Sequence, residues 1–208
     1  MNYFIFYIYE FLASFTPFLI ILIFFNHSHK KQKLQIPKFY NILLIIFACY
    51  LIGVYHFTGA GTFYEIATYQ LEIRKDKINL VPFSNTIDII AYLLNIILFI
   101  PLGFLIPVLW KKINKFIYIL GIGFLFSVFI ETTQLINNRQ TDIDDVILNT
   151  LGAVIGFILY KICKYYLKQK FQLTVIHTIA LPVCILVIFT GRFLLFNEMG
   201  LAKMLYHF

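Results

Sequence analysis

The sequence predicts an all-α fold, a polytopic membrane helical bundle with about six transmembrane helices. Hydrophobic residues make up 61% of the 208 residues and charged residues only 13%, whereas soluble domains are about half apolar and a quarter charged. The apolar residues stand in uninterrupted runs of bilayer length, not in periodic stripes. The formal charge of +7 comes from short basic tracts that flank these runs, so no nucleic-acid partner is expected.

Six apolar runs define the expected spans within a single membrane domain, 1–208. Met1 leads almost directly into apolar sequence without a basic segment, so the first run is expected to be a retained span and not a cleaved signal. The hydropathy places the spans at roughly 3–25, 39–57, 88–109, 116–136, 146–163 and 173–195.

The basic residues predict the orientation of the spans. Connections 26–38, 110–115 and 161–172 hold eleven of the seventeen lysines and arginines. Because positive connections stay in the cytoplasm, we expect a multi-pass plasma-membrane protein with both termini, loop 58–87 and loop 137–145 outside. None of the ten acids falls on the cytoplasmic side in this arrangement.

The extracytoplasmic loop 58–87 is the one sizeable connection. Within it, apolar and polar residues alternate on both sides of a charged turn. Such alternation is typical of strands, and we therefore expect either a short β-hairpin at 70–81 or a strand-like cap that lies on the membrane surface.

The fourth span ends with polar residues on one helical face. Glu131 lies three residues before Gln134 and four after Ser127, so the three side chains share a face. A carboxylate toward the middle of a membrane helix costs about 2.5–3.5 kcal/mol, and it normally faces the bundle or a wet cavity. Glu131 therefore either hydrogen-bonds a neighbouring helix or takes part in binding or catalysis.

The fifth span carries a second polar face. Asp145 and Asn149 are four residues apart and share a face with Gly152 and Gly156. Two glycines at this spacing let helices approach closely. This face is therefore expected to point into the bundle.

The acidic loop before the fifth span has two interpretations. Thr141 or Asp142 can cap the helix, and acids in its first turn suit the positive end of the helix dipole. The spacing of Asp142, Asp144 and Asp145 also suggests oxygen ligands for a metal ion. Short acidic loops are common and no histidine has metal-ligand spacing, so neither a metal nor another cofactor is assigned.

Asn95 in the third span adds a further amide, and Pro101 predicts a kink in the same helix. Together the polar side chains are expected to converge at the outer mouth of a three-helix core. Such groups can coordinate a cation, hold a polar headgroup, or act as acid and base. The candidate binding residues are Asn95, Ser127, Glu131, Gln134, Asp142, Asp145 and Asn149.

Four stretches in the middle of the chain form an ordered set: 78–83 (INLVPF), 95–104 (NIILFIPLGF), 127–134 (SVFIETTQ) and 142–153 (DIDDVILNTLGA). In this order and spacing they resemble the VanZ-like family, with a core at 78–160. The matching positions are Asn79, Pro82, Phe83, Asn95, Phe99, Pro101, Gly103, Ser127, Glu131, Gln134, Asp142, Asp145, Asn149, Gly152 and Gly156. The resemblance implies a bacterial plasma-membrane protein from a family named for teicoplanin resistance.

Two functions of different classes stay open, and a small transporter has little support because no inverted repeat is evident. In the first, the outer cluster binds a membrane-lipid headgroup, a lipid-linked cell-wall precursor or the lipoglycopeptide antibiotic itself. In the second, the protein is an enzyme that modifies a lipid headgroup, with Glu131 as general base and Asp142 or Asp145 as acid or metal ligand.

Overall fold

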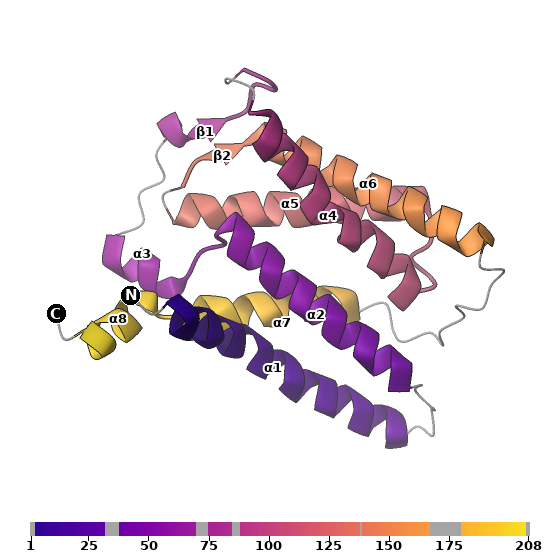
Figure 1. Cartoon of the computed structure of the whole chain (residues 1–208), viewed down its shortest axis with the longest axis horizontal. Coiled ribbons are helices and arrows are strands. Elements are labelled where there is room, and N and C mark those ends of the chain that lie inside the picture. Colours follow the sequence, from indigo (N-terminus) through magenta and orange to yellow (C-terminus); the bar gives the residue numbers. More distant parts are fainter. Residues whose placement is uncertain are drawn as a thin grey trace. The chain divides into compact units, whose positions relative to one another are not determined.

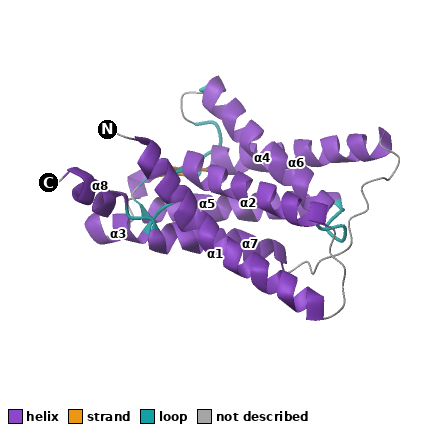
Figure 2. Cartoon of the chain, turned by 60° about the horizontal axis from the view of Figure 1, so that its bottom comes forward, coloured by secondary structure: helices purple, strands orange, loops and turns teal. Residues whose placement is uncertain are grey.

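The computed structural model of the chain describes residues 3–31, 38–69, 75–84, 88–137, 139–166 and 180–206 (Figures 1 and 2). Helices make up nearly all of this structure, so the all-α prediction is confirmed. The elements in order are α1 (Tyr3–Lys31), α2 (Lys38–Thr58), α3 (Phe63–Tyr69), a 3-10 turn (Lys75–Lys77), β1 (Ile78–Asn79), α4 (Ile89–Leu109), α5 (Phe116–Ile136), β2 (Thr141–Asp142), α6 (Ile143–Tyr166), α7 (Ala180–Leu195) and α8 (Glu198–Tyr206).

Five helical segments within the described part of the chain are long and apolar enough to cross a membrane. They are Phe4–His27, Phe39–Thr68, Ile89–Leu109, Phe116–Leu135 and Ile143–Tyr166. A sixth candidate is the pair α7 and α8, which is bent by 40° at a short break. The first part of the sixth predicted span, 173–179, lies outside the described residues. The protein is a multi-pass membrane protein, as its composition predicts.

The helices fall into two compact units. Unit 1 comprises Met1–Leu71 and Pro182–Phe208, and unit 2 comprises Glu72–Leu181. Unit 1 therefore contains α1, α2, α3, α8 and most of α7, while unit 2 contains α4, α5 and α6 together with both strands. The 78–160 stretch that carries the ordered motifs lies wholly inside unit 2.

Unit 2 is built on a close contact between α4 and α6, which run side by side in Figure 1. Glycines make this contact possible because a Cβ atom at any of three positions would collide with a carbonyl oxygen of the facing helix. The Cβ would lie 1.8 Å from Ala153 O at Gly103, 2.2 Å from Ile96 O at Gly152 and 2.0 Å from Ile100 O at Gly156. The prediction that the glycine face of α6 points into the bundle is confirmed.

The two short strands correct part of the hairpin prediction for 70–81. Ile78 pairs with Thr141 and Asn79 pairs with Asp142, in parallel. The second arm of the expected hairpin is therefore joined to the segment before α6, while residues 70–74 lie outside the described residues. Local alternation could not reveal this pairing, because its partner strand is far away in the sequence.

In unit 1, the chain turns sharply between α2 and α3. Gly59 adopts a φ of 65°, and the amides of Gly59 and Ala60 donate to the carbonyl oxygens of His56 and Tyr55, which is the Schellman pattern. Helix α3 then lies within the predicted 58–87 loop. It begins with a capping box, since the Thr62 amide donates to Glu65 Oε2 at 2.9 Å and the Glu65 amide donates to Thr62 Oγ1 at 3.3 Å.

Candidate functional site

The candidate site lies at one end of unit 2, where α4 and α6 begin, α5 ends and the two strands pair (Figure 1). Four acids gather there from three elements. Glu131 is in the last turns of α5, Asp142 is in β2, and Asp144 and Asp145 form the first turn of α6. The fold thus brings together residues from all four stretches that carry the sequence motifs, 78–83, 95–104, 127–134 and 142–153.

Glu131 is 4% exposed, and it joins the end of α5 to β2. Its Oε2 accepts a hydrogen bond from the backbone amide of Asp142 at 3.2 Å, and its carbonyl oxygen accepts one from Thr141 Oγ1 at 3.1 Å. The expectation that Glu131 faces the bundle and not lipid agrees with this burial.

Asp142 holds β1 to the start of α6. Its Oδ1 accepts from the backbone amide of Asp144 at 3.0 Å, so Asp142 caps α6, as one of the two expected residues. Its two carboxylate oxygens also lie 3.1 and 3.2 Å from Asn79 Nδ2. One side chain therefore fixes both the helix end and the strand pairing.

Asp144 was not among the predicted binding residues, yet it is 1% exposed. Its Oδ1 accepts from the backbone amide of Phe83 at 2.8 Å, and its Oδ2 accepts from the hydroxyl of Tyr92 in α4. Tyr92 was also missed. Its position three residues before Asn95 placed it on the same helical face, and that was the available signal.

Asp145 and Asn149 extend the polar face of α6 into the bundle. Asn95 Nδ2 donates to Asp145 Oδ1 at 2.5 Å, and one turn further along α6 Asn149 Nδ2 lies 2.9 Å from Ser127 Oγ. Asn149 is 2% exposed, and its buried Oδ1 has no hydrogen-bond partner among the residues that the structure describes. The structure thus places four of the predicted residues in contact across α4, α5 and α6, in two pairs that the sequence spacing did not identify.

Gln134, the remaining predicted residue, is buried in the last turn of α5. Its carbonyl oxygen accepts from the backbone amides of Asn137 and Arg139, both at 3.0 Å. Gln134 therefore lies at the same end of unit 2 as the four acids.

The site is strongly acidic. In the part of the chain that the structure describes, no lysine or arginine forms an ion pair with Glu131, Asp144 or Asp145. Their recorded donors are instead uncharged: backbone amides, a carboxamide and a phenol. Such an arrangement attracts cationic groups and repels anions. Within the same described residues, no group of three acidic, histidine or cysteine side chains has the arrangement of a metal site.

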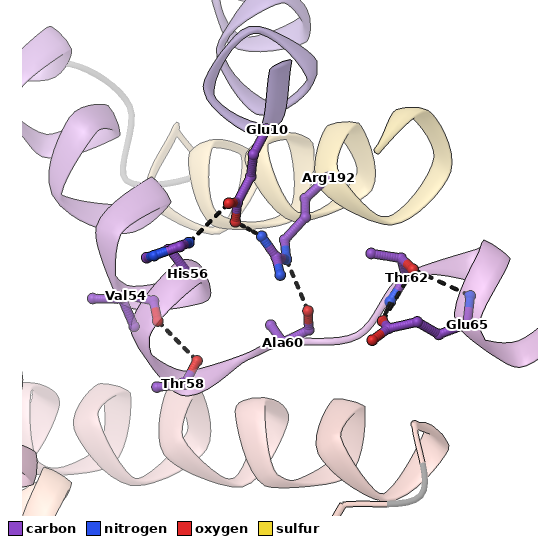
Figure 3. Close-up of polar contacts among 8 residues, drawn as sticks. All are labelled: Glu10, Val54, His56, Thr58, Ala60, Thr62, Glu65 and Arg192. Atoms are coloured by element: carbon purple, nitrogen blue, oxygen red, sulfur yellow. Dashed lines mark hydrogen bonds and ion pairs between the residues drawn. The ribbon is translucent and has the colours of Figure 1, made fainter. Parts of the chain in front are cut away.

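Unit 1 holds a second polar cluster, which the sequence analysis did not predict (Figure 3). Glu10 of α1 forms an ion pair with Arg192 of α7 and lies 2.8 Å from His56 Nδ1 of α2. Arg192 Nε also donates to the carbonyl oxygen of Ala60 at 2.8 Å. The available signal was that Glu10, His56 and Arg192 each lie near the end of an apolar run that the predicted orientation places on the same side of the membrane.

Comparison with known proteins places these features in a family. The sequence model of the VanZ/LLP1 family matches residues 47–164. Protein VanZ of Enterococcus faecium is 34% identical over 97 residues, which is 45% of this chain and 58% of that protein. The chain thus spans somewhat more than half the length of this relative. No solved structure matches the present chain significantly. Since the matched region covers more than half of the chain, including all of α4, α5 and the four clustered acids, the chain belongs to the VanZ family.

Proposed function

We propose that the acidic site of unit 2 binds a positively charged amino group in the polar part of a lipid-tailed ligand at the membrane surface and that this binding contributes to teicoplanin resistance. The ligand would be a cell-envelope lipid, a lipid-linked cell-wall precursor or the lipid-tailed antibiotic. The observation that carries the proposal is the concentration of four carboxylates, three of them without a basic partner among the described residues.

The fixed geometry of the acids supports a binding role. Asp142 and Asp144 each accept from two donors on separate segments, so their oxygens are held in place before a ligand arrives. Preorganised groups lose little conformational entropy on binding. The buried, unpartnered Oδ1 of Asn149 adds another acceptor one helical turn deeper than Asp145.

The proposed orientation puts this site outside the cell. It follows from the basic connections at 26–38, 110–115 and 161–172, and it gives extracytoplasmic termini in the plasma membrane. After Cys49, Cys163 and Cys184 are replaced by serine or alanine, a cysteine introduced at exposed Gln140 should react with a membrane-impermeant maleimide in intact cells. Reaction only after the cells are lysed would contradict the proposed orientation and place this loop in the cytoplasm.

Deleting the gene tests the resistance role. The deletion strain should become more sensitive to teicoplanin than to vancomycin, which lacks the lipid tail. Restoring the wild-type gene should restore growth in teicoplanin. An equal change in sensitivity to both antibiotics would contradict a role that depends on a lipid-tailed ligand.

A membrane-embedded enzyme acting on a lipid headgroup is the second candidate. Glu131 favours it, because a buried carboxylate that accepts from a backbone amide and has no basic partner in the described structure can serve as a general base. The Glu131→Gln variant keeps an acceptor oxygen for the Asp142 amide. Lipid extracts of this variant and the wild type, compared by mass spectrometry, should differ if the protein is an enzyme and match if it only binds.

A further inference from the structure

A turn of exposed apolar side chains lies beside the acidic site. Leu80 is 68% exposed, Val81 63% and Phe83 52%. They follow β1 directly, and Pro82 stands between the last two. We call residues 80–83 the apolar turn.

The apolar turn is held in a fixed conformation. Asn79 Oδ1 accepts from the Val81 amide at 3.1 Å and lies 3.0 Å from Ser84 Oγ, while the Phe83 amide donates to Asp144 Oδ1 at 2.8 Å. Phe83 has a φ of 55°, in the left-handed region that disfavours bulky side chains. The same polar residues that build the acidic site therefore force three large apolar side chains outward.

The surface next to the turn is also apolar. Helix α4 begins soon afterwards, and Ile89, Ile90, Leu93 and Leu94 in its first turns are all exposed. Of the five candidate spans, Ile89–Leu109 has the smallest buried share, 22%. An exposed apolar surface of this kind marks a contact with another apolar phase, and for a membrane span that phase is lipid.

We infer that the apolar turn inserts into the acyl chains of the leaflet in which α4 begins. Inserted there, it continues the lipid-facing surface of α4 beyond the end of the helix. The acids that anchor the turn would then lie at headgroup depth. This inference concerns the protein and its bilayer, so it holds or fails whatever ligand the acidic site takes.

Depth measurement with a spin label tests the insertion. Cys49, Cys163 and Cys184 are first replaced by serine or alanine, and a single label is attached at Val81→Cys in the full chain. The protein is reconstituted into vesicles of phosphatidylglycerol and phosphatidylcholine. Electron paramagnetic resonance then compares relaxation by oxygen, which concentrates in acyl chains, with relaxation by a water-soluble nickel chelate.

The matched control is Gln140→Cys, an exposed polar position in the connection that leads to β2. The label at 81 should be relaxed several-fold more by oxygen than by nickel, and the label at 140 more by nickel. A label at 81 that is as accessible to nickel as the control overturns the inference, and so does one shielded from both reagents by protein. Leu80→Cys provides the same readout if the first variant does not fold.

Discussion

Removing one charge from the buried cluster of unit 1 should destabilise the protein far more than removing two. The side chains of Arg192 and Glu10 are 9% and 7% exposed, and they form an ion pair. Breaking a buried pair by deleting one partner costs about 3–5 kcal/mol, because the remaining charge is left without compensation. Replacing both partners by well-packed hydrophobic residues of similar volume is often neutral or stabilising.

The structure also predicts which single change is worse. In the Glu10→Gln variant, Arg192 Nε still donates to the carbonyl oxygen of Ala60 at 2.8 Å, and Arg192 Cζ still lies 5.4 Å from the centroid of the Phe196 ring. Arg192→Met leaves Glu10 Oε2 with its hydrogen bond to His56 Nδ1 at 2.8 Å. We therefore expect Glu10→Gln to cost about 3–5 kcal/mol. Arg192→Met should cost less, although it also removes the hydrogen bond from the charged Arg192 guanidinium to Ala60 O, which is worth about 1.5–3 kcal/mol.

Unfolding in mixed detergent and dodecyl sulfate micelles, followed by far-ultraviolet circular dichroism, measures these free energies. The double variant should be more stable than Glu10→Gln alone, and Lys203→Gln, at an exposed lysine of the same unit, should behave as the wild type. If each single change costs under about 1 kcal/mol and the two costs simply add, the ion pair does not contribute to stability as its burial indicates.

Two further changes test the packing and polar contacts of unit 2 by thermal unfolding. Gly152→Ala puts a Cβ atom 2.2 Å from Ile96 O and should lower the melting temperature by several degrees. The control Gly121→Ala has no atom within 4 Å of the new Cβ, and it should leave the melting temperature unchanged or raise it, because alanine favours a helix more than glycine does. Equal effects of the two changes would contradict the close contact of α4 and α6. Tyr92→Phe removes a hydrogen bond to the carboxylate of Asp144 and should cost about 1.5–3 kcal/mol, and an unchanged melting temperature would show that this contact is not stabilising.

Most of the spans were predictable because each apolar run is continuous and of bilayer length. The predicted span 116–136 coincides with α5. The predicted start at 146 missed the first turn of α6, which begins at Ile143. By hydropathy alone, Asp144 and Asp145 are assigned to a loop because they are strongly polar. Asp142 caps the helix, however, and both acids therefore lie in the first turn of α6.

The contacts within one helix face could be predicted from sequence spacing, whereas the contacts between distant segments could not. Asp145 and Asn149 fall on one face, as their spacing of four requires. In contrast, 63 residues separate Asn79 from Asp142, and 46 separate Glu10 from His56. Neither pairing leaves a periodic signal in the sequence, since it depends on how the helices pack.

The most direct test of the acidic site is antibiotic sensitivity in cells that express Asp145→Asn in place of the wild type. Its amide oxygen can still accept the hydrogen bond from Asn95, now 2.5 Å long, so the charge is removed while the contact is kept. At equal protein levels, we predict that Asp145→Asn cells become as sensitive to teicoplanin as the deletion strain, while Glu198→Gln cells match the wild type. Full resistance in Asp145→Asn cells would contradict the proposal that the negative charge of this cluster carries the function.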